Sequence, residues 1–394
     1  MDGNDFWLWL APVALLPVFF AMGWFAARVD MRSVLAQAKS VPVGFYKSLD
    51  ALVERNSGKA VRELAEVVDQ QSDAKQSTYE LHLTLGKLYR QRGENDKAVV
   101  LHQKLLDSPD TVGERRDAVL FELGQDYQAA GLVDRAEQIF IGLQNGVMAK
   151  PARQVLLHIY QQDRDWEKAI ELAQTLSHGD QSYQFEIAQF YCERAQAALF
   201  QSRFDEATAY AHQALAVNRK CTRANLILGD AAQKQGQYQA AINAYSAIEK
   251  QNHEYLSMAA ERLYDAYDAL GKPQEGLAVL QGYAQTFPQL DIINVIYEKS
   301  LLLYGEQAAA QTAADLVRAK PDLAGVYRLL GLQISDMDPT WRADADLMRS
   351  VVGRQMQKAV MYRCRHCHFK SQVFFWHCPA CNKWETFTPN RIEV

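Results

Sequence analysis

The chain has 394 residues, of which 48% are hydrophobic and 23% are charged, with a formal net charge of −5. This composition is globular and long enough for two or three packed units, so it argues against disorder. The 47 acidic and 42 basic residues are mixed along the chain without a basic patch, so nucleic acid is not an expected partner.

The first element in chain order is an uncharged apolar run from Phe6 to Ala27. As a helix this run would be about 33 Å long, which matches the hydrocarbon core of a bilayer. A cleaved signal peptide needs basic residues before the run, but only Asp2 and Asp5 carry charge there. We therefore expect residues 1–30 to form a single transmembrane anchor.

The orientation of this anchor follows from the residues that flank it. Basic side chains follow the run and none precedes it: Arg28, Arg32, Lys39 and Lys47. Because basic flanks stay on the cytoplasmic side, we expect an inner-membrane protein whose bulk is cytoplasmic.

Residues 41–358 repeat a helix, a turn and a second helix. The pairs Leu85-Gly86, Leu123-Gly124 and Leu228-Gly229 are each followed, twelve positions after the glycine, by alanine. The small residues that mark the period are Ala60, Ala98, Ala136, Ala169, Ala207, Ala241, Gly276 and Ala309. This spacing resembles the tetratricopeptide repeat. We expect an all-α superhelical solenoid of about eight to nine helix pairs.

Partner binding in such an array is expected on the concave surface lined by the first helix of each repeat. The polar residues next to the packing face are Lys87, Arg90, Gln125, Gln128, His158, Gln161, Asp230 and Gln233. Their mixed charge favours contacts with protein but does not indicate a particular ligand. The alternative is that these residues form an ordinary solvated helix face. Cys192 and Cys221, on predicted helices, are interpreted as small buried hydrophobic residues.

Four cysteines near the C-terminus carry the most specific chemical signal. The pairs Cys364-x-x-Cys367 and Cys378-x-x-Cys381 are separated by ten residues. Two such turns supply the four thiolates that one Zn²⁺ or one iron accepts in a tetrahedral site. We expect residues 360–390 to form a small metal-binding domain that depends on the ion for its folding energy.

Other interpretations of these cysteines are weaker. Free thiols do not explain the paired spacing, and a thioredoxin-like redox pair lacks its βαβ context. His366, His368 and His377 are alternative ligands, but four thiolates already close a structural site. A closed site leaves no position for substrate, and no nucleophile or phosphate-loop motif is present, so we do not expect an enzyme.

The two cysteine turns resemble those of rubredoxin, with aromatic residues around them and Pro379 after Cys378. The long interior of a true rubredoxin is missing, and His368 and Asn382 replace the glycines that usually follow each second cysteine. A structural zinc or iron is therefore favoured over electron transfer.

Anchor, repeats and cysteine turns together resemble the lipopolysaccharide assembly protein B family. The matching stretches are Tyr362–Phe369, Trp376–Cys381, His82–Gly86, Arg92–Glu94, Gly124–Leu132, Asp134–Glu137 and Glu186–Glu193. The resemblance implies a non-enzymatic inner-membrane adaptor that restrains lipopolysaccharide synthesis. It further implies that the deacetylase LpxC is presented to the protease FtsH, with a PbgA/YejM-type inner-membrane protein as the signal input.

The residues alone leave two other functions open. One is an electron-transfer subunit with a Cys₄ iron, in which the repeats act as a docking arm. The other is a general scaffold for envelope assembly. The identity and reducibility of the metal test the first, and the proteins that co-purify with the chain test the second.

Overall fold

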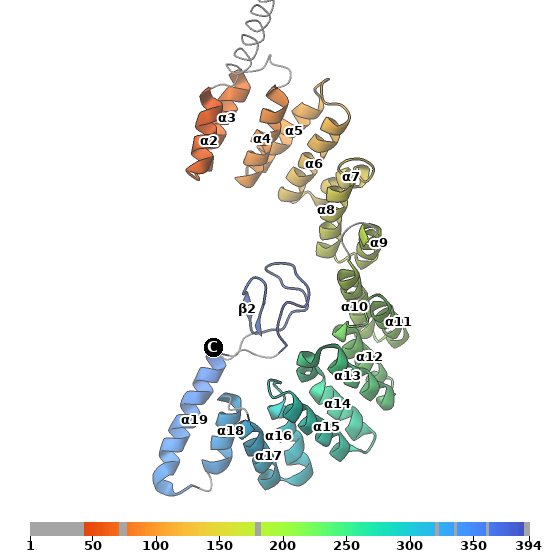
Figure 1. The fold of residues 1–394 in the computed structure, drawn as a ribbon, viewed down its shortest axis with the longest axis vertical. Coiled ribbons are helices and arrows are strands. Elements are labelled where there is room, and N and C mark those ends of the chain that lie inside the picture. The colour runs from red at the N-terminus through yellow and green to blue at the C-terminus, as the bar shows by residue number, and fades with distance from the viewer. Residues whose placement is uncertain are drawn as a thin grey trace, which may run out of the picture. The chain divides into compact units, whose positions relative to one another are not determined.

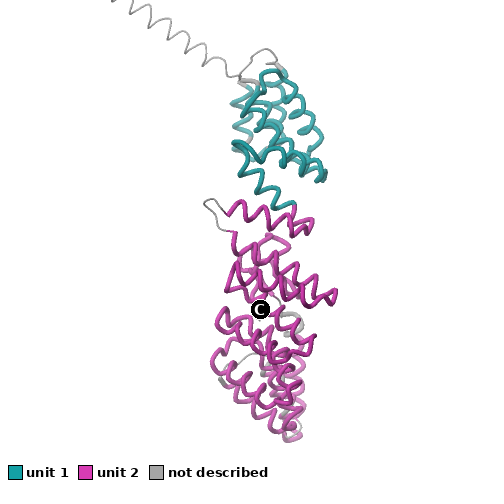
Figure 2. Tube along the Cα trace, turned by 90° about the vertical axis from the view of Figure 1, so that its right-hand side faces the viewer, with its two compact units in different colours: residues 1–159 teal, residues 160–394 magenta. Residues whose placement is uncertain are grey.

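The computed structural model describes residues 43–70, 77–177, 183–319, 323–334, 337–359 and 362–389. The predicted anchor, Phe6 to Ala27, lies outside these ranges. Among the described helices, none is long and apolar enough to cross a bilayer. The chain divides into two compact units, residues 1–159 (unit 1) and residues 160–394 (unit 2), coloured separately in Figure 2.

Unit 1 is built from successive helix pairs (Figure 1). The pairs are α2 (Val43–Val53) with α3 (Ser57–Gln70), α4 (Ser77–Gln91) with α5 (Asn95–Leu106), and α6 (Glu114–Ala129) with α7 (Val133–Gly142). Helix α8 (Ala149–Gln162) then runs from unit 1 into unit 2.

Unit 2 continues the same pattern and ends in a small irregular domain. Its helices are α9 (Trp166–Ser177), α10 (Gln184–Phe200), α11 (Phe204–Val217), α12 (Thr222–Lys234), α13 (Tyr238–Asn252), the 3₁₀ helix η1 (His253–Tyr255), α14 (Leu256–Ala269), α15 (Pro273–Thr286), α16 (Ile293–Tyr304), α17 (Glu306–Ala319), α18 (Leu323–Gln333) and α19 (Pro339–Ala359). The domain that follows contains the antiparallel strands β1 (Tyr362–Arg363) and β2 (Lys370–Ser371). The array is therefore all-α, as predicted.

From α2 to α17, the turn inside each helix pair reverses the chain through one left-handed residue. Gly93 and Gly131 have φ of 77° and 78°, and the amide of the next residue donates to the carbonyl of Tyr89 and of Tyr127. This is the usual glycine end of a helix. Arg164 and Ser202 adopt the same conformation without glycine, with φ of 58° and 59°. The turn geometry is thus kept even where the sequence signal is absent.

Close helix contact within a repeat depends on a glycine that faces an aromatic ring. A Cβ atom added to Gly124 would lie 2.7 Å from the ring of Phe140, and one added to Gly229 would overlap Tyr245. In the second repeat the same place beneath Gly86 is taken by His102. The chain therefore buries an imidazole where neighbouring repeats bury an apolar or phenolic ring.

His102 belongs to a buried polar network in unit 1. Its Nδ1 contacts Asp126, and both side chains are fully buried. Arg90 on α4 donates to Asp126 Oδ1 and to Glu122 Oε2, each at 2.6 Å. Because a buried charge without its partner is strongly destabilising, these groups must be present together. The network joins α4, α5 and α6.

The largest core of unit 2 lies between α12 and α16. It contains the fully buried side chains of Tyr245, Ile248, Leu263 and Leu280. Two aromatic side chains of the C-terminal domain, Phe374 and Trp376, pack against it. The metal-binding domain is therefore attached to the repeats of unit 2 by hydrophobic contacts as well as by the chain.

Candidate metal centre

Each cysteine pair of the C-terminal domain forms the same tight turn. In the first, the amide of Cys364 donates to Phe369 O (2.9 Å) and the amide of His368 donates to Cys364 O (3.0 Å). In the second, Cys378 and Asn382 make the matching bonds, both 2.9 Å long. His368 and Asn382 have φ of 62° and 54°, the region that favours glycine. The turns therefore form without glycine, but His368 and Asn382 adopt a strained backbone conformation.

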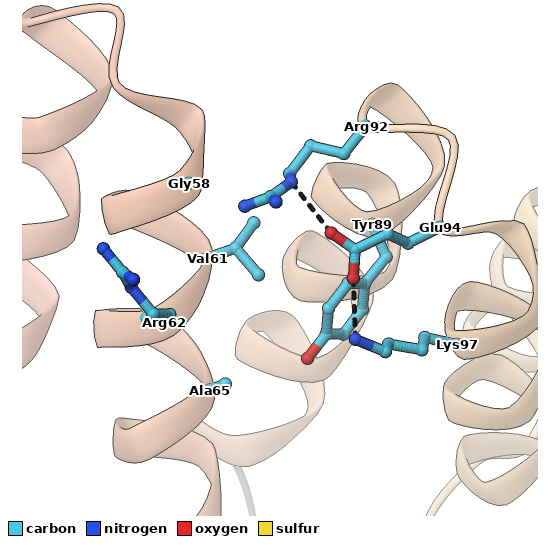
Figure 3. Close-up of a pocket in the computed structure, with 8 residues that line it drawn as sticks. All are labelled: Gly58, Val61, Arg62, Ala65, Tyr89, Arg92, Glu94 and Lys97. Carbon is cyan, nitrogen blue, oxygen red and sulfur yellow. Dashed lines mark hydrogen bonds and ion pairs between the residues drawn. The ribbon is translucent and has the colours of Figure 1, made fainter.

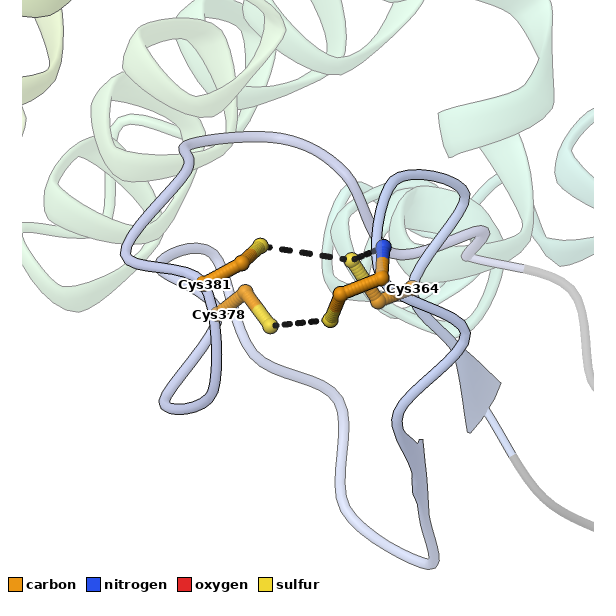
Figure 4. A group of neighbouring side chains, drawn as sticks. Cys364, Cys378 and Cys381 are labelled. Carbon is orange, nitrogen blue, oxygen red and sulfur yellow. Dashed lines mark hydrogen bonds between the residues drawn. The ribbon is translucent and has the colours of Figure 1, made fainter. Parts of the chain in front are cut away.

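These turns bring the four predicted ligands together (Figure 4). All four sulfur atoms lie within 4.8 Å of one another, with Cys364 Sγ 3.8 Å from Cys381 Sγ and Cys367 Sγ 3.7 Å from Cys378 Sγ. A tetrahedral ion with Zn–S bonds of about 2.3 Å sets its sulfur ligands about 3.8 Å apart. The donor set therefore fits one Zn²⁺ or one iron.

The thiols differ in how readily they ionise. Burial raises the pKa of Cys378 and raises that of Cys381 to about 12. Burial acts on Cys364 in the same direction, but the amide of Cys367 and the hydroxyl of Thr386 lower its pKa to about 6. Thiolates are the metal ligands, so binding of a cation releases the remaining protons and supplies folding energy to this domain.

Aromatic side chains fix this domain to the repeats. Trp384 is only 6% exposed, and its ring lies 6.0 Å from that of Phe190 on α10 and 6.1 Å from that of Trp166 on α9. Trp376 stacks on Tyr255 of η1, with 5.2 Å between ring centroids and 7° between planes. Two tryptophans of the small domain are thus covered by repeat residues.

Polar contacts surround the aromatic ones. Gln189 Nε2 donates to Glu385 Oε1 (2.6 Å), and Arg365 pairs with Glu254 (2.7 Å). The guanidinium of Arg223 on α12 lies over the Trp376 ring at 5.4 Å. Burial raises the pKa of Glu385, although Gln189 and Arg223 act to lower it. The docked position is therefore specified by hydrogen bonds and charge as well as by burial.

The sequence predicted the cluster of four cysteines, which the structure shows, but not the surface that receives this domain. The repeat residues that contact it are Trp166, Gln189, Phe190, Arg223, Glu254 and Tyr255. One signal was available, because a domain this small cannot bury both Trp376 and Trp384 inside itself. His377 stacks on Trp384 at 4.4 Å, while His366 and His368 are exposed, and none of the three joins the sulfur cluster.

The predicted partner-binding residues occupy varied environments. Arg90 lies in the buried network, where Gln125 accepts its hydrogen bond, and Lys87 pairs with Glu122. Asp230 and Gln233 accept the hydroxyl of Tyr245 at 2.7 and 3.1 Å. The exposure of the remaining predicted residues also differs, since His158 is exposed whereas Gln128 and Gln161 are half-buried. Their role in partner binding stays a prediction.

Unit 1 also has a hollow of about 260 Å³ beside α3 and α4 (Figure 3). Its lining residues are Gly58, Val61, Arg62, Ala65, Tyr89, Arg92, Glu94 and Lys97. Arg92 and Lys97 both pair with Glu94, at 2.9 and 2.8 Å. The positive charge of these two side chains is thus partly neutralised within the hollow.

Fold and site together define a tetratricopeptide-repeat protein that carries a C-terminal rubredoxin-type metal-binding domain. A family model described as a rubredoxin metal binding domain matches residues 362–389, and tetratricopeptide-repeat models match residues 81–116, 192–254 and 228–291. The chain is 30% identical over 382 residues to lipopolysaccharide assembly protein B of Escherichia coli K12, covering 96% of this chain and 97% of that protein. The Haemophilus influenzae protein of the same name is 29% identical, with 95% and 96% covered. The chain belongs to the lipopolysaccharide assembly protein B family.

Proposed function

We propose that this chain is a non-enzymatic adaptor that regulates lipopolysaccharide synthesis by presenting the deacetylase LpxC to the protease FtsH. The observation that carries the proposal is a closed four-sulfur centre docked on a repeat array, in a chain similar to lipopolysaccharide assembly protein B along almost its whole length. Repeat arrays offer extended surfaces for protein partners. A metal ion bound by four thiolates, in turn, has a structural role and would stabilise the docked domain.

The adaptor is proposed to act at the inner membrane, with its bulk in the cytoplasm. The apolar run from Phe6 to Ala27 and the basic residues after it support an anchor in this orientation. A PbgA/YejM-type protein is the proposed membrane partner. Tethering raises the effective concentration of one partner near another, so modest affinities on each side suffice.

The test measures the half-life of LpxC in cells that carry different forms of the chain at equal expression. Cys364→Ser removes one ligand of the metal centre, and deletion of residues 1–30 removes the proposed anchor. Cys192→Ala is the matched control, because it changes a cysteine outside the metal centre.

We expect LpxC to persist longer with either disrupted form and to behave normally with the control. Equal half-lives in all forms would contradict the adaptor function. Affinity capture from detergent extracts adds a second readout, because a general scaffold would retain envelope proteins without LpxC or FtsH.

A further inference from the structure

Helix α19 closes the repeat array, and one of its faces is apolar and open. The exposed fractions of Trp341, Leu347, Met348 and Val351 are 66%, 60%, 58% and 50%. Terminal repeats of a solenoid usually carry a polar outer face, and exposed apolar patches mark contact sites. The open face of α19 therefore needs an occupant.

The opposite face of α19 is already used by its neighbour α18. Arg349 lies over the ring of Tyr327 at 4.9 Å, and a Cβ atom added to Gly353 would lie 2.9 Å from the same ring. The apolar face is therefore distinct from the contact that holds α19 in the last repeat.

Four side chains on the open face have a symmetric arrangement. Leu347 and Val351 lie two positions before and after residue 349, and Asp344 and Arg354 lie five positions before and after it. With about 100° of turn per residue, the four fall within a sector of about 80°. In that sector Asp344 and Val351 lie on one side of the midline, and the other two lie on the opposite side.

This arrangement is self-complementary under a twofold rotation. Leu347 and Val351 lie at equal distances before and after the midpoint, as do Asp344 and Arg354, so the members of each pair exchange levels when the direction of the helix is reversed. A second copy of α19, packed antiparallel on this face about a twofold axis that passes between the two helices at the level of residue 349, brings each carboxylate level with a guanidinium. Such a surface is what a symmetric dimer interface requires.

We propose that α19 pairs with α19 of a second copy of this chain, with Leu347 packed on Val351 and Asp344 paired with Arg354 across the twofold axis. The two charged groups are available for this contact. Within the described ranges Asp344 forms no hydrogen bond or ion pair, and Arg354 donates only to Ser350 O on its own helix (3.4 Å).

The small area of this interface predicts a low affinity between the two copies. One helix from each copy buries less than the 1,200–2,000 Å² that stable interfaces reach, so association is expected to be concentration-dependent. It rests only on described residues of unit 2, and it is independent of the proposed adaptor function and of the anchor.

The test uses two differently tagged copies of the full chain, co-expressed and captured from a detergent extract through one tag. Asp344→Arg or Arg354→Asp in both copies sets like charges opposite each other and should lower capture about tenfold. Asp346→Arg is the matched control, because Asp346 is exposed on α19 but lies outside the sector.

A mixed pair gives the sharpest result. When one copy carries Asp344→Arg and the other carries Arg354→Asp, both cross-pairs again join opposite charges, and capture should return to the wild-type amount. Wild-type capture in the single variants, no recovery in the mixed pair, or no self-capture of the wild type would each overturn the proposal. The first outcome would assign the open face to a different partner.

Discussion

Replacing Trp384 by alanine should release the metal domain from the repeats of unit 2. The side chain is 6% exposed and contacts Phe190 and Trp166 through its ring. Truncation of a buried tryptophan typically costs about 3–5 kcal/mol. At about 1.4 kcal/mol for each factor of ten, docking should weaken by about a hundredfold to several thousandfold.

The docked state can be measured by oxidative labelling of Tyr255, which is 3% exposed and stacks on Trp376. Labelling should rise in Trp384→Ala while the bound metal stays at one ion per chain. Trp341→Ala is the matched control, since it makes the same change at a side chain that is 66% exposed. Arg223→Gln should raise labelling from the repeat side without altering the metal domain.

The outcome that refutes this reasoning is unchanged labelling of Tyr255 in both Trp384→Ala and Arg223→Gln. Loss of metal in Trp384→Ala would show that the tryptophan supports the metal turns themselves. In that case the Arg223 variant alone decides whether the contact with the repeats holds the domain.

Four further outcomes are expected. Cys364→Ser should bring the metal content close to zero with the helical circular dichroism kept; full metal retention would contradict the ligand assignment. Because burial raises the pKa of Glu385, docking favours the protonated carboxyl. Docking should therefore be strongest below the ordinary pKa of 4.5, weaken as the pH rises through the raised pKa, and lose this dependence in Glu385→Gln. Asn382→Gly should stabilise the metal domain by about 1 kcal/mol in thermal melts, and a lower midpoint would exclude strain at this residue. Asp126→Ala removes the carboxylate that His102 and Arg90 share, while Arg90 keeps Glu122. It should lower the free energy of unfolding by about 1–3 kcal/mol in denaturant titrations, and a loss below about 0.5 kcal/mol would show that the network is dispensable.

The features that could be predicted from the sequence depend on residues close together in the chain. The CxxC spacing predicted that four cysteines cluster, because each turn is formed by a few consecutive residues; they are Cys364, Cys367, Cys378 and Cys381. The repeat period likewise identified small residues such as Ala98 and Ala136, which are fully buried. Local spacing is sufficient in both cases.

The docked position of the metal domain could not be predicted in this way. Gln189 and Glu385 are 196 positions apart, and no periodicity links them. The predicted partner-binding residues gave a similar difficulty. The sequence predicts that Arg90 is an exposed cation, but in the fold it pairs with Glu122 and Asp126. Side-chain pairing across helices decides which polar residues remain free for a partner.

The distance in sequence between Gln189 and Glu385 sets an order of events during translation. Chains emerge from the ribosome at about 5–20 residues per second, and early segments fold first. The 196 positions between the two residues correspond to about 10–40 s in which Phe190 is made but lacks the domain that covers it. Tyr255 and its partner Trp376 are 121 positions apart (376 − 255), which corresponds to about 6–24 s. A chain truncated before its last cysteine pair lacks Trp384 and Glu385, so the repeat surface that these residues cover stays open to water in the incomplete product.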